Sequence, residues 1–280
     1  MNRNSYISNT SVSVDTIKRI APSVFAEHPW EGVSDRYSFI PTSKVMESMI
    51  EEGWFVTRVQ QNMVRLEDKR NFARHMIRFR RQEGSLAVGD VFPEIGLINS
   101  HDRGSAYKMF AGFFRLACLN GMVVGEGSIS QISIRHSGSV IDEVKQGAFD
   151  ISNSMPALVE DIKEMKAIDL TQDEQFAFAK AAVELKYEKE HPIWETSERM
   201  LQPRRYSDNG KDLWSTFNNV QENLTKGGLR YFKHGHYDEE GMFHPASHQR
   251  TREIKSIHED VKLNKALWTL AEEMKKIKAA

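Results

Sequence analysis

Near residue 137 the chain changes from one residue pattern to another, and this change limits the folds open to it. Between residues 37 and 136, short runs of β-branched and aromatic residues alternate with clusters of Gly, Asn, Asp and Ser, as in strands joined by turns. The gaps are too short for helical crossovers, so we expect the strands to pair antiparallel. The expected strands are RYSFIP, GWFVTRVQ, FARHMIRFR, PEIGLINS, AYKMFAGFFRLACLNGMVV and QISIRH.

The second pattern is helical. Within residues 137–168, apolar residues recur every three or four positions, which is typical of amphipathic helices. This segment forms one long helix or two in series, since Pro156 is a possible break. Thr171 and Glu174 have the spacing of a capping box and predict that another helix begins there. Strands followed by helices predict an α+β fold, with long helices packing on an N-terminal antiparallel sheet.

The same patterns suggest a domain organisation. Residues 1–36 are rich in Ser and Asn with small apolar islands, so we expect an N-terminal arm with one short helical turn. Residues 37–136 form the β-rich region, and residues 137–280 form a helical region that makes one compact domain with the sheet. We also expect helices at 210–226 and 256–277, and loops at 191–209 and 228–252.

Composition excludes several classes of protein. The 280 residues carry a net charge of −1, so a uniformly basic nucleic-acid binder is excluded, and a polyanion site requires local segregation of charge. The single cysteine, Cys118, allows no internal disulfide and no cysteine-based zinc site. There is no apolar run of membrane-spanning length and no apolar signal segment near the start. We therefore expect a soluble, cytoplasmic protein with no membrane contact.

Positive charge is segregated in the segment around NFARHMIRFRRQ, residues 71–82. Between residues 58 and 81 there are eight Arg or Lys against two acids, a net charge of +6. In an extended strand Arg74, Arg78 and Arg80 project to one face with Phe72 and Met76, and the other face is mostly apolar. The first face is therefore expected to be cationic and the second to meet the core.

Three interpretations of this cationic face remain open. It is a groove for a nucleic-acid backbone, an ordinary solvated face balanced by acids of the helices, or a surface for an acidic protein. Arginine matches phosphate geometry and aromatic rings stack on unpaired bases, which favours a nucleic-acid site. The candidate contacts are Arg58, Arg65, Arg70, Arg74, Arg78, Arg80, Arg81, Trp54 and Tyr107, with Arg204 and Arg205 as second-rank candidates.

Other motifs give weaker signals for chemistry. The residues from Asn99 to Gly104 have the composition of a turn at the end of a strand. The alternative is a catalytic pair, in which His101 is a general base and Asp102 orients it. Cys118 lies in an apolar run and is expected to be a small buried hydrophobe. GEGSIS, residues 125–130, lacks the Lys-Ser/Thr ending of a P-loop and is expected to be a hairpin turn. We predict no catalytic residues and no cofactor.

Histidines cluster between residues 231 and 248. Imidazole and carboxylate ligands at such spacings can hold zinc, so the weak metal candidates are His234, His236, His244 and His248. However, the two histidines of an H-x-x-x-H pair can bind one metal only if a helix aligns them. Pro245 lies between His244 and His248 and disfavours a helix there. A flexible segment that is incidentally rich in histidine is the preferred interpretation, and no metal site is predicted.

Several phrases together resemble a known family. NSHD, FFRLACLNGMVVG and IRHSGSV, with APSVF, ARHMIRFRR, TQDEQ, LQPRR, DLWSTFNNVQENLTKGG and LNKALW, are similar to the family called domain of unknown function 932, found on phages, prophages and plasmids. The resemblance covers most of the chain, but residues 231–248 look longer and richer in histidine than expected. It brings no activity or catalytic residue, and implies a mobile-element setting in which recombination, repair and evasion of host defences are common.

The leading functional hypothesis is a protein that binds single-stranded nucleic acid in recombination or repair, by annealing strands. Antiparallel strands followed by a long helix are also the plan of known annealing proteins, which is an analogy of fold only. The alternatives are an anti-defence protein that binds a host protein, and a metal-dependent enzyme using the histidine segment. Partners are therefore expected to be single-stranded nucleic acid, a host defence protein, or further copies of the chain.

Overall fold

The main sheet precedes the long helices along the chain, as expected. The structure is a computed structural model, and it describes residues 4–31, 39–81, 87, 89–102, 104–115, 120–123, 132–134 and 139–279. It contains two compact units, Met1–Glu160 and Asp161–Ala280, which are described separately below. Cys118 and residues 125–130 lie outside the described residues. The boundary between the units lies within a helix, 24 residues beyond the change of pattern at 136.

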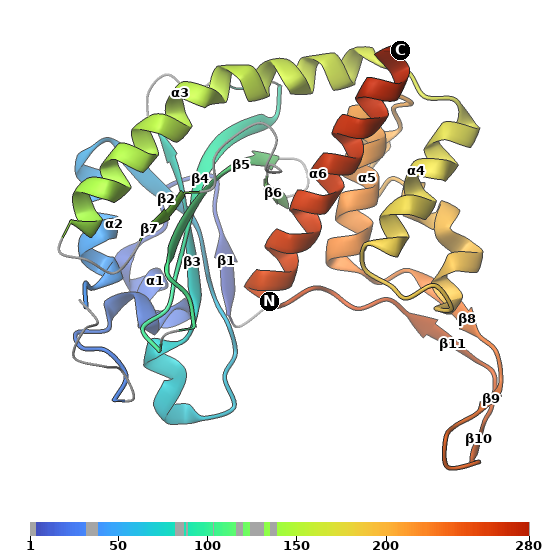
Figure 1. Cartoon of the computed structure of the whole chain (residues 1–280), viewed down its shortest axis with the longest axis horizontal. Coiled ribbons are helices and arrows are strands. Elements are labelled where there is room, and N and C mark those ends of the chain that lie inside the picture. The colour runs from blue at the N-terminus through green and yellow to red at the C-terminus, as the bar shows by residue number, and fades with distance from the viewer. Residues whose placement is uncertain are drawn as a thin grey trace. The chain divides into compact units, whose positions relative to one another are not determined.

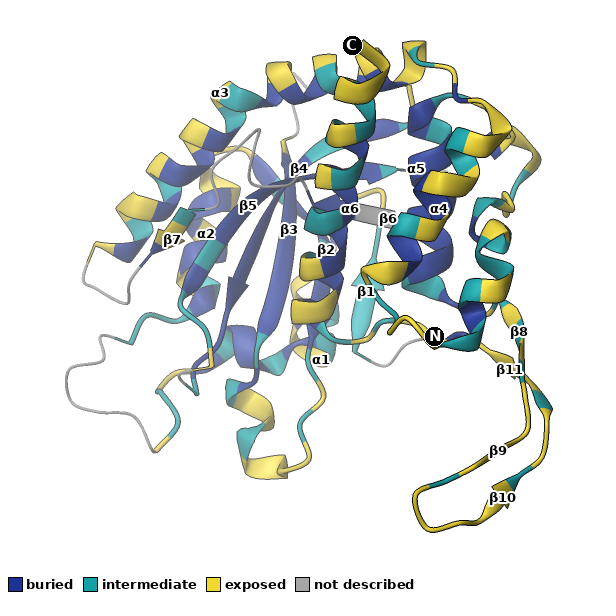
Figure 2. Ribbon diagram, turned by 45° about the vertical axis from the view of Figure 1, so that its right-hand side comes forward, coloured by how far each residue is buried: buried dark blue, intermediate teal, exposed yellow. Residues whose placement is uncertain are grey.

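The first unit is built on a seven-stranded antiparallel sheet with the order β1-β2-β3-β4-β5-β6, in which β7 also pairs with β5. The strands are β1 (Ser5–Ile7), β2 (Trp54–Gln61), β3 (His75–Arg81), β4 (Val91–Asn99), β5 (Tyr107–Arg115), β6 (Asn120–Val123) and β7 (Ile132–Ile134). Consecutive strands are neighbours from β1 to β6, although residues 8–53 lie between β1 and β2. The central strands β3, β4 and β5 are buried along most of their length (Figure 2). The expectation of an α+β fold with an N-terminal antiparallel sheet is therefore confirmed.

One face of this sheet is covered by helices. These are α1 (Val14–Ile20), η1 (Pro22–Phe25), α2 (Thr42–Glu51) and the first part of α3 (Val140–Ala167). Figure 1 shows α2 and the N-terminal part of α3 beside the strands. Gly147 permits the approach of α3, because a Cβ there would lie 3.0 Å from Cδ1 of Ile132 and 3.2 Å from Sδ of Met109. The apolar positions of α3 thus pack against β5 and β7.

Helix α2 was not expected from the sequence. RYSFIP, residues 36–41, was expected to be a strand, but residues 36–38 lie outside the described residues and Pro41 directly precedes α2. The helix buries Val45, Met46 and Met49, whose three- and four-residue spacing is helical. It ends at Glu51, and Gly53, two residues further on, has a φ of 84°, which suits glycine. Ten helical residues inside a β-rich stretch were too short a pattern to separate from the strands around them.

The second unit packs helices around α5 (Leu213–Lys226). Its other elements are the end of α3, α4 (Gln172–Glu184), η3 (Pro192–Leu201), η4 (Tyr206–Asp208), α6 (Ile257–Ala279) and the short strands β8 (Arg230–Lys233), β9 (His236–Tyr237), β10 (Phe243–His244) and β11 (Ser247–Arg250). The capping box of Thr171 and Glu174 is present at the start of α4. Trp214 stacks on Phe217 at 5.6 Å, and Trp268 meets Phe217 edge-on at 6.0 Å. These rings form the apolar contact between α5 and α6.

Of the two alternatives for residues 137–168, one long helix is observed, because α3 continues through Pro156 without a break. The expectation of loops in this half of the chain is wrong. The expected loops contain regular structure: residues 191–209 include η3 and η4, and residues 228–252 include two antiparallel strand pairs. None of the helices in the described part of the chain combines the length and apolarity that a bilayer-spanning helix needs.

Candidate nucleic-acid interface

Strand β3 has no solvated cationic face. Arg78 is 1% exposed and Arg80 is 5% exposed, so the expectation that both project to solvent is wrong. They lie on the sheet face opposite the helices, as the alternation predicts, but that face is also buried. The pattern of alternation fixes which side chains share a face. It does not determine which face meets water.

Both arginines pair within the first unit with a single carboxylate, that of Glu94, which is fully buried. Nη2 of Arg80 donates to Oε1 of Glu94 at 2.9 Å, and Nη1 of Arg78 lies 3.7 Å from Oε2. Oγ1 of Thr57 donates to the same carboxylate at 2.7 Å. The Arg80 guanidinium also lies 4.7 Å from the ring centroid of Phe92. This buried ion cluster holds β2, β3 and β4 together and leaves Arg80 no path to a phosphate.

Glycines in the neighbouring strands make room for the cluster. Nη1 of Arg78 crosses β5 and donates to the carbonyl of Met122 at 3.2 Å. A Cβ on Gly112 would lie 3.2 Å from that nitrogen and 2.5 Å from that carbonyl oxygen, and a Cβ on Gly96 would overlap the ring of Phe110. Glycine inside a strand marks such close approaches. Gly96 and Gly112 were therefore the sequence signal for a crowded face.

The other predicted contacts of the first unit are scattered. Arg65 and Arg70 are exposed, whereas Arg58 and Arg74 are half-buried. Nη2 of Arg58 donates to Gln60 at 2.8 Å, and Arg74 donates to the carbonyl of Gly104. Tyr107 is fully buried and its hydroxyl donates to the carbonyl of Ile40 at 2.8 Å. Its ring is not available to a base, so the proposed stacking role for Tyr107 is wrong.

Arg204 and Arg205, expected to lie on a loop without partners, anchor that loop to α5. Nε of Arg204 donates to Asn223 at 2.8 Å, and its Nη2 donates to the carbonyl of Gly227. Arg205 pairs with Asp208 at 2.9 Å and with Glu222, which is 3% exposed. Asn219, Glu222 and Asn223 of α5 are buried where they bind this loop. Both arginines therefore serve the fold of the second unit.

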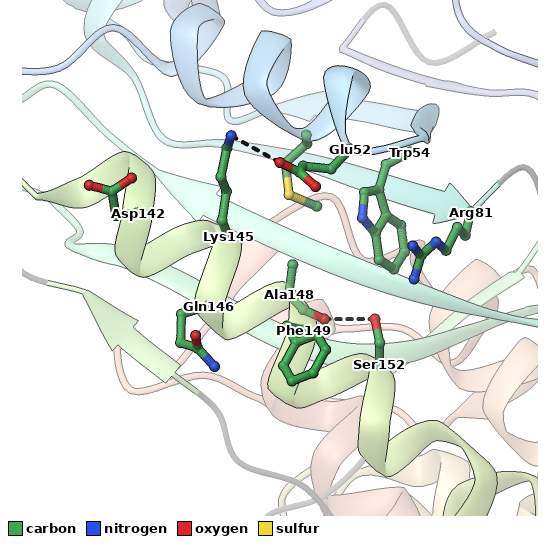
Figure 3. A pocket seen from close by; sticks show the side chains of 10 residues that line it. Glu52, Trp54, Arg81, Asp142, Lys145, Gln146, Ala148, Phe149 and Ser152 are labelled. Carbon is green, nitrogen blue, oxygen red and sulfur yellow. Dashed lines mark hydrogen bonds and ion pairs between the residues drawn. The ribbon is translucent and has the colours of Figure 1, made fainter.

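Trp54 and Arg81 are brought together at one end of β2 and β3. They are register partners across the two strands, and the Arg81 guanidinium lies 5.8 Å from the indole centroid. Arg81 is exposed, and Trp54 is 8% exposed. Figure 3 shows the two side chains next to each other at the edge of a pocket of about 330 Å³. A cation over an indole face is an attractive arrangement.

Helices α2 and α3 supply the rest of this pocket, which we call the Trp54 pocket. Nζ of Lys145 pairs with Glu52 at 3.0 Å (Figure 3), and this hydrogen bond raises the pKa of Lys145. One turn along α3, Phe149 is 61% exposed. Asp142, Gln146 and Ser152 complete the polar lining. Asp142, Lys145, Phe149 and Ser152 follow one another at steps of three and four residues, which places them on one face of α3.

The chemistry of the Trp54 pocket suits a planar ligand with little charge. Its volume lies at the lower end of the roughly 300–1,000 Å³ found for ligand pockets. Arg81 and Lys145 are balanced by Glu52 and Asp142, so the pocket carries no formal excess charge. Trp54 and Phe149 supply aromatic surface, and Gln146 supplies both a donor and an acceptor. A nucleobase has matching features, a flat π surface and a polar edge.

The NSHD motif forms a buried polar network rather than a catalytic pair. Nε2 of His101 lies 3.1 Å from Oγ1 of Thr42, which also lies 2.9 Å from Nε2 of His75. Asp102 instead accepts from the backbone of Gly104 at 2.9 Å, as expected for a turn. Burial lowers the pKa of His75 to about 4, so its imidazole is neutral at pH 7. The network ties α2 to the ends of β3 and β4.

The histidine segment is an antiparallel ribbon. His236 and His244 are cross-strand partners with ring centroids 5.1 Å apart. Nε2 of His244 lies 2.7 Å from Asp238, and this hydrogen bond lowers the pKa of the carboxyl group. His234 lies 3.3 Å from Glu195. Within the described residues no group of three or more His, Cys, Asp or Glu is placed to hold a metal ion.

These features define an α+β protein whose sheet unit carries a small aromatic pocket beside an exposed arginine. A family comparison matches residues 29–268 to the family described as a domain of unknown function (DUF932), and the chain belongs to that family. It is similar to the UPF0380 proteins YafZ and YfjQ of Escherichia coli strain K12. Each is 39% identical over 255 residues, covering 91% of this chain and 88% of the relative. No solved structure matches significantly.

Proposed function

We propose that the protein binds single-stranded nucleic acid, acting in the cytoplasm in the recombination or repair of mobile-element DNA by annealing strands. The observation that carries the proposal is the placement of Arg81 over Trp54, beside the exposed ring of Phe149. Stacked bases and a nearby phosphate require this combination of aromatic surface and arginine.

In the proposed mode of binding, an unpaired base enters the Trp54 pocket edge-first. Its π surface packs against Trp54 and Phe149, which contributes on the order of 1–3 kcal/mol per stacked base. The Arg81 guanidinium, exposed at the rim, pairs with the adjoining phosphate. Lys145 stays bound to Glu52 and sets the distance between α2 and α3. A duplex does not offer an unstacked base, so single strands are the preferred ligand.

Binding of labelled oligonucleotides at two salt concentrations tests the proposal. The informative variants are Arg81→Ala and Phe149→Ala. Their matched controls are Lys44→Ala, an exposed cation on α2, and Met63→Ala, which is 78% exposed. We expect the pocket variants to weaken single-strand binding several-fold and the controls to bind like the wild type. Affinity that does not change with salt, or equal affinity for duplex, would contradict the proposal.

A second candidate function is inhibition of a host defence protein by direct binding. It is favoured by the exposed apolar side chains at the tip of the ribbon, where Tyr237 is 72%, Met242 62% and Phe243 55% exposed. Grouped apolar side chains of this size mark protein contacts. Affinity capture from host lysate treated with nuclease distinguishes the candidates, because a protein partner survives the treatment and a nucleic-acid-bridged one does not.

A further inference from the structure

The base of the histidine ribbon is a two-stranded sheet with two different faces. Strands β8 and β11 pair in register over four residues, from Arg230 opposite Arg250 to Lys233 opposite Ser247. Within the second unit they lead away from the helices (Figures 1 and 2). We call these two strands the stem. Because side chains alternate along a strand, each face of the stem receives every second residue.

The inner face of the stem packs on its own unit. The ring of Tyr231 lies 4.9 Å from the ring of His191, at the start of η3. Lys233 is on the same face and is half-buried. The outer face consists of the exposed side chains of Arg230, Phe232, His248 and Arg250, and the exposed His234 follows directly after β8.

Two arginines face each other on this outer face. Arg230 and Arg250 are direct cross-strand partners, and like charges in this position are destabilising. Neither guanidinium has an ion pair or a side-chain hydrogen bond with any residue that the structure describes. Nη1 of Arg199 donates to the carbonyl of Arg230 at 2.8 Å, which brings a third guanidinium to the same end. An anion bound between these cations would remove the repulsion.

Aromatic rings continue the face beyond the arginines. Phe232 is 39% exposed and lies between two histidines. Its ring centroid is 5.0 Å from that of His234 and 5.3 Å from that of His248, both in edge-on contact. The two histidine rings contact the phenyl ring and leave 39% of Phe232 exposed. Arginines next to a held aromatic ring are the groups that single-strand binders use for phosphates and bases.

We propose that the outer face of the stem is a binding surface for single-stranded nucleic acid, separate from the Trp54 pocket. Adjacent phosphates bind Arg230 and Arg250, and the neighbouring base stacks on Phe232. The residues that carry this inference all lie in the second unit. It rests on the proposed function only in taking single-stranded nucleic acid as the class of ligand.

Binding of a labelled oligothymidylate to the full chain, measured by anisotropy over a range of salt, tests this surface. The double variant Arg230→Ala/Arg250→Ala should weaken binding about tenfold or more and reduce the salt slope by about 1.4, since each phosphate contact on a single strand contributes about 0.7. Phe232→Ala should weaken binding by about tenfold with little change in slope. Lys233→Ala, a cation on the inner face of the same strand, is the matched control and should bind like the wild type.

The outcomes separate this inference from the proposed function. Loss in the stem variants but not in Arg81→Ala or Phe149→Ala supports the stem and overturns the role of the pocket. Wild-type affinity in the stem variants overturns the stem, whatever the pocket variants do. Binding of a polyglutamate peptide as tight as that of the oligonucleotide would assign the face to an acidic protein and also overturn it. No binding by the wild type overturns both proposals.

Discussion

The arginines of β3 and those of the stem have opposite environments. Arg78 and Arg80 lie on one face of a strand, share the buried carboxylate of Glu94 and are at most 5% exposed. Arg230 and Arg250 lie opposite each other on a two-stranded ribbon and are exposed, with no acid between them. Both pairs are cations in short β-strands. The comparison shows that burial in the tertiary structure, rather than the density of charge in the sequence, determines which arginines can contact a ligand.

The largest expected effect comes from removing the acid that the two buried arginines share. Glu94→Ala leaves two guanidinium groups buried without their carboxylate, so we expect the free energy of unfolding of the first unit to fall by about 3–5 kcal/mol. Urea unfolding measures it. Glu52→Ala removes a carboxylate from an exposed pair with Lys145 and should cost no more than about 1 kcal/mol. Equal small losses in both variants would mean that the β3 arginines are hydrated after all.

Buried His75 gives the first unit a pH dependence. Burial lowers its pKa from 6.5 to about 4, so between these values the unfolded chain binds a proton that the folded chain excludes. Stability is therefore full above pH 6.5 and falls as pH drops through this window, by on the order of 3 kcal/mol. His75→Gln should flatten the profile of unfolding free energy against pH in this range. An unchanged slope would contradict the burial of this imidazole.

Arg205, in the second unit, was predicted from the sequence to contact phosphate, and its substitution tests whether it stabilises the fold instead. It bonds Asp208 and Glu222, both buried, so Arg205→Ala should lower the free energy of unfolding by about 1.5–3 kcal/mol, as expected for hydrogen bonds to charged groups. Oligonucleotide affinity measured under folding conditions should not change. A loss of affinity with unchanged stability would return Arg205 to the binding surface.

The smallest effect on stability is expected at the stem. Arg230→Ala/Arg250→Ala removes a like-charge pair, so stability should stay the same or rise by about 0.2–1 kcal/mol. The gain should be largest at low salt, because exposed charges are screened as salt increases. Thermal unfolding at two ionic strengths measures this. A marked destabilisation would show that these arginines have structural partners, as Arg78 and Arg80 do.

Local patterns were sufficient to predict part of this structure. The capping box at Thr171 and the periodicity of α3 each depend on neighbours in sequence, and each is observed. The pairing of Arg205 with Glu222 joins positions 17 residues apart, and the sharing of Glu94 depends on strand register. Neither of these two ion pairings can be predicted from the spacing of residues that are close in sequence. Strands of four residues or fewer, such as β8 and β11, are also shorter than any periodic pattern that could reveal them.

Photocrosslinking of a bound single strand, followed by mapping of the crosslinked peptides, tests most directly whether the exposed and not the buried cations form the interface. We expect crosslinks at Trp54 or Phe149 in the first unit and at Phe232 in the stem, with none between residues 75 and 80. Crosslinks confined to that part of β3, or spread without regard to exposure, would contradict the account.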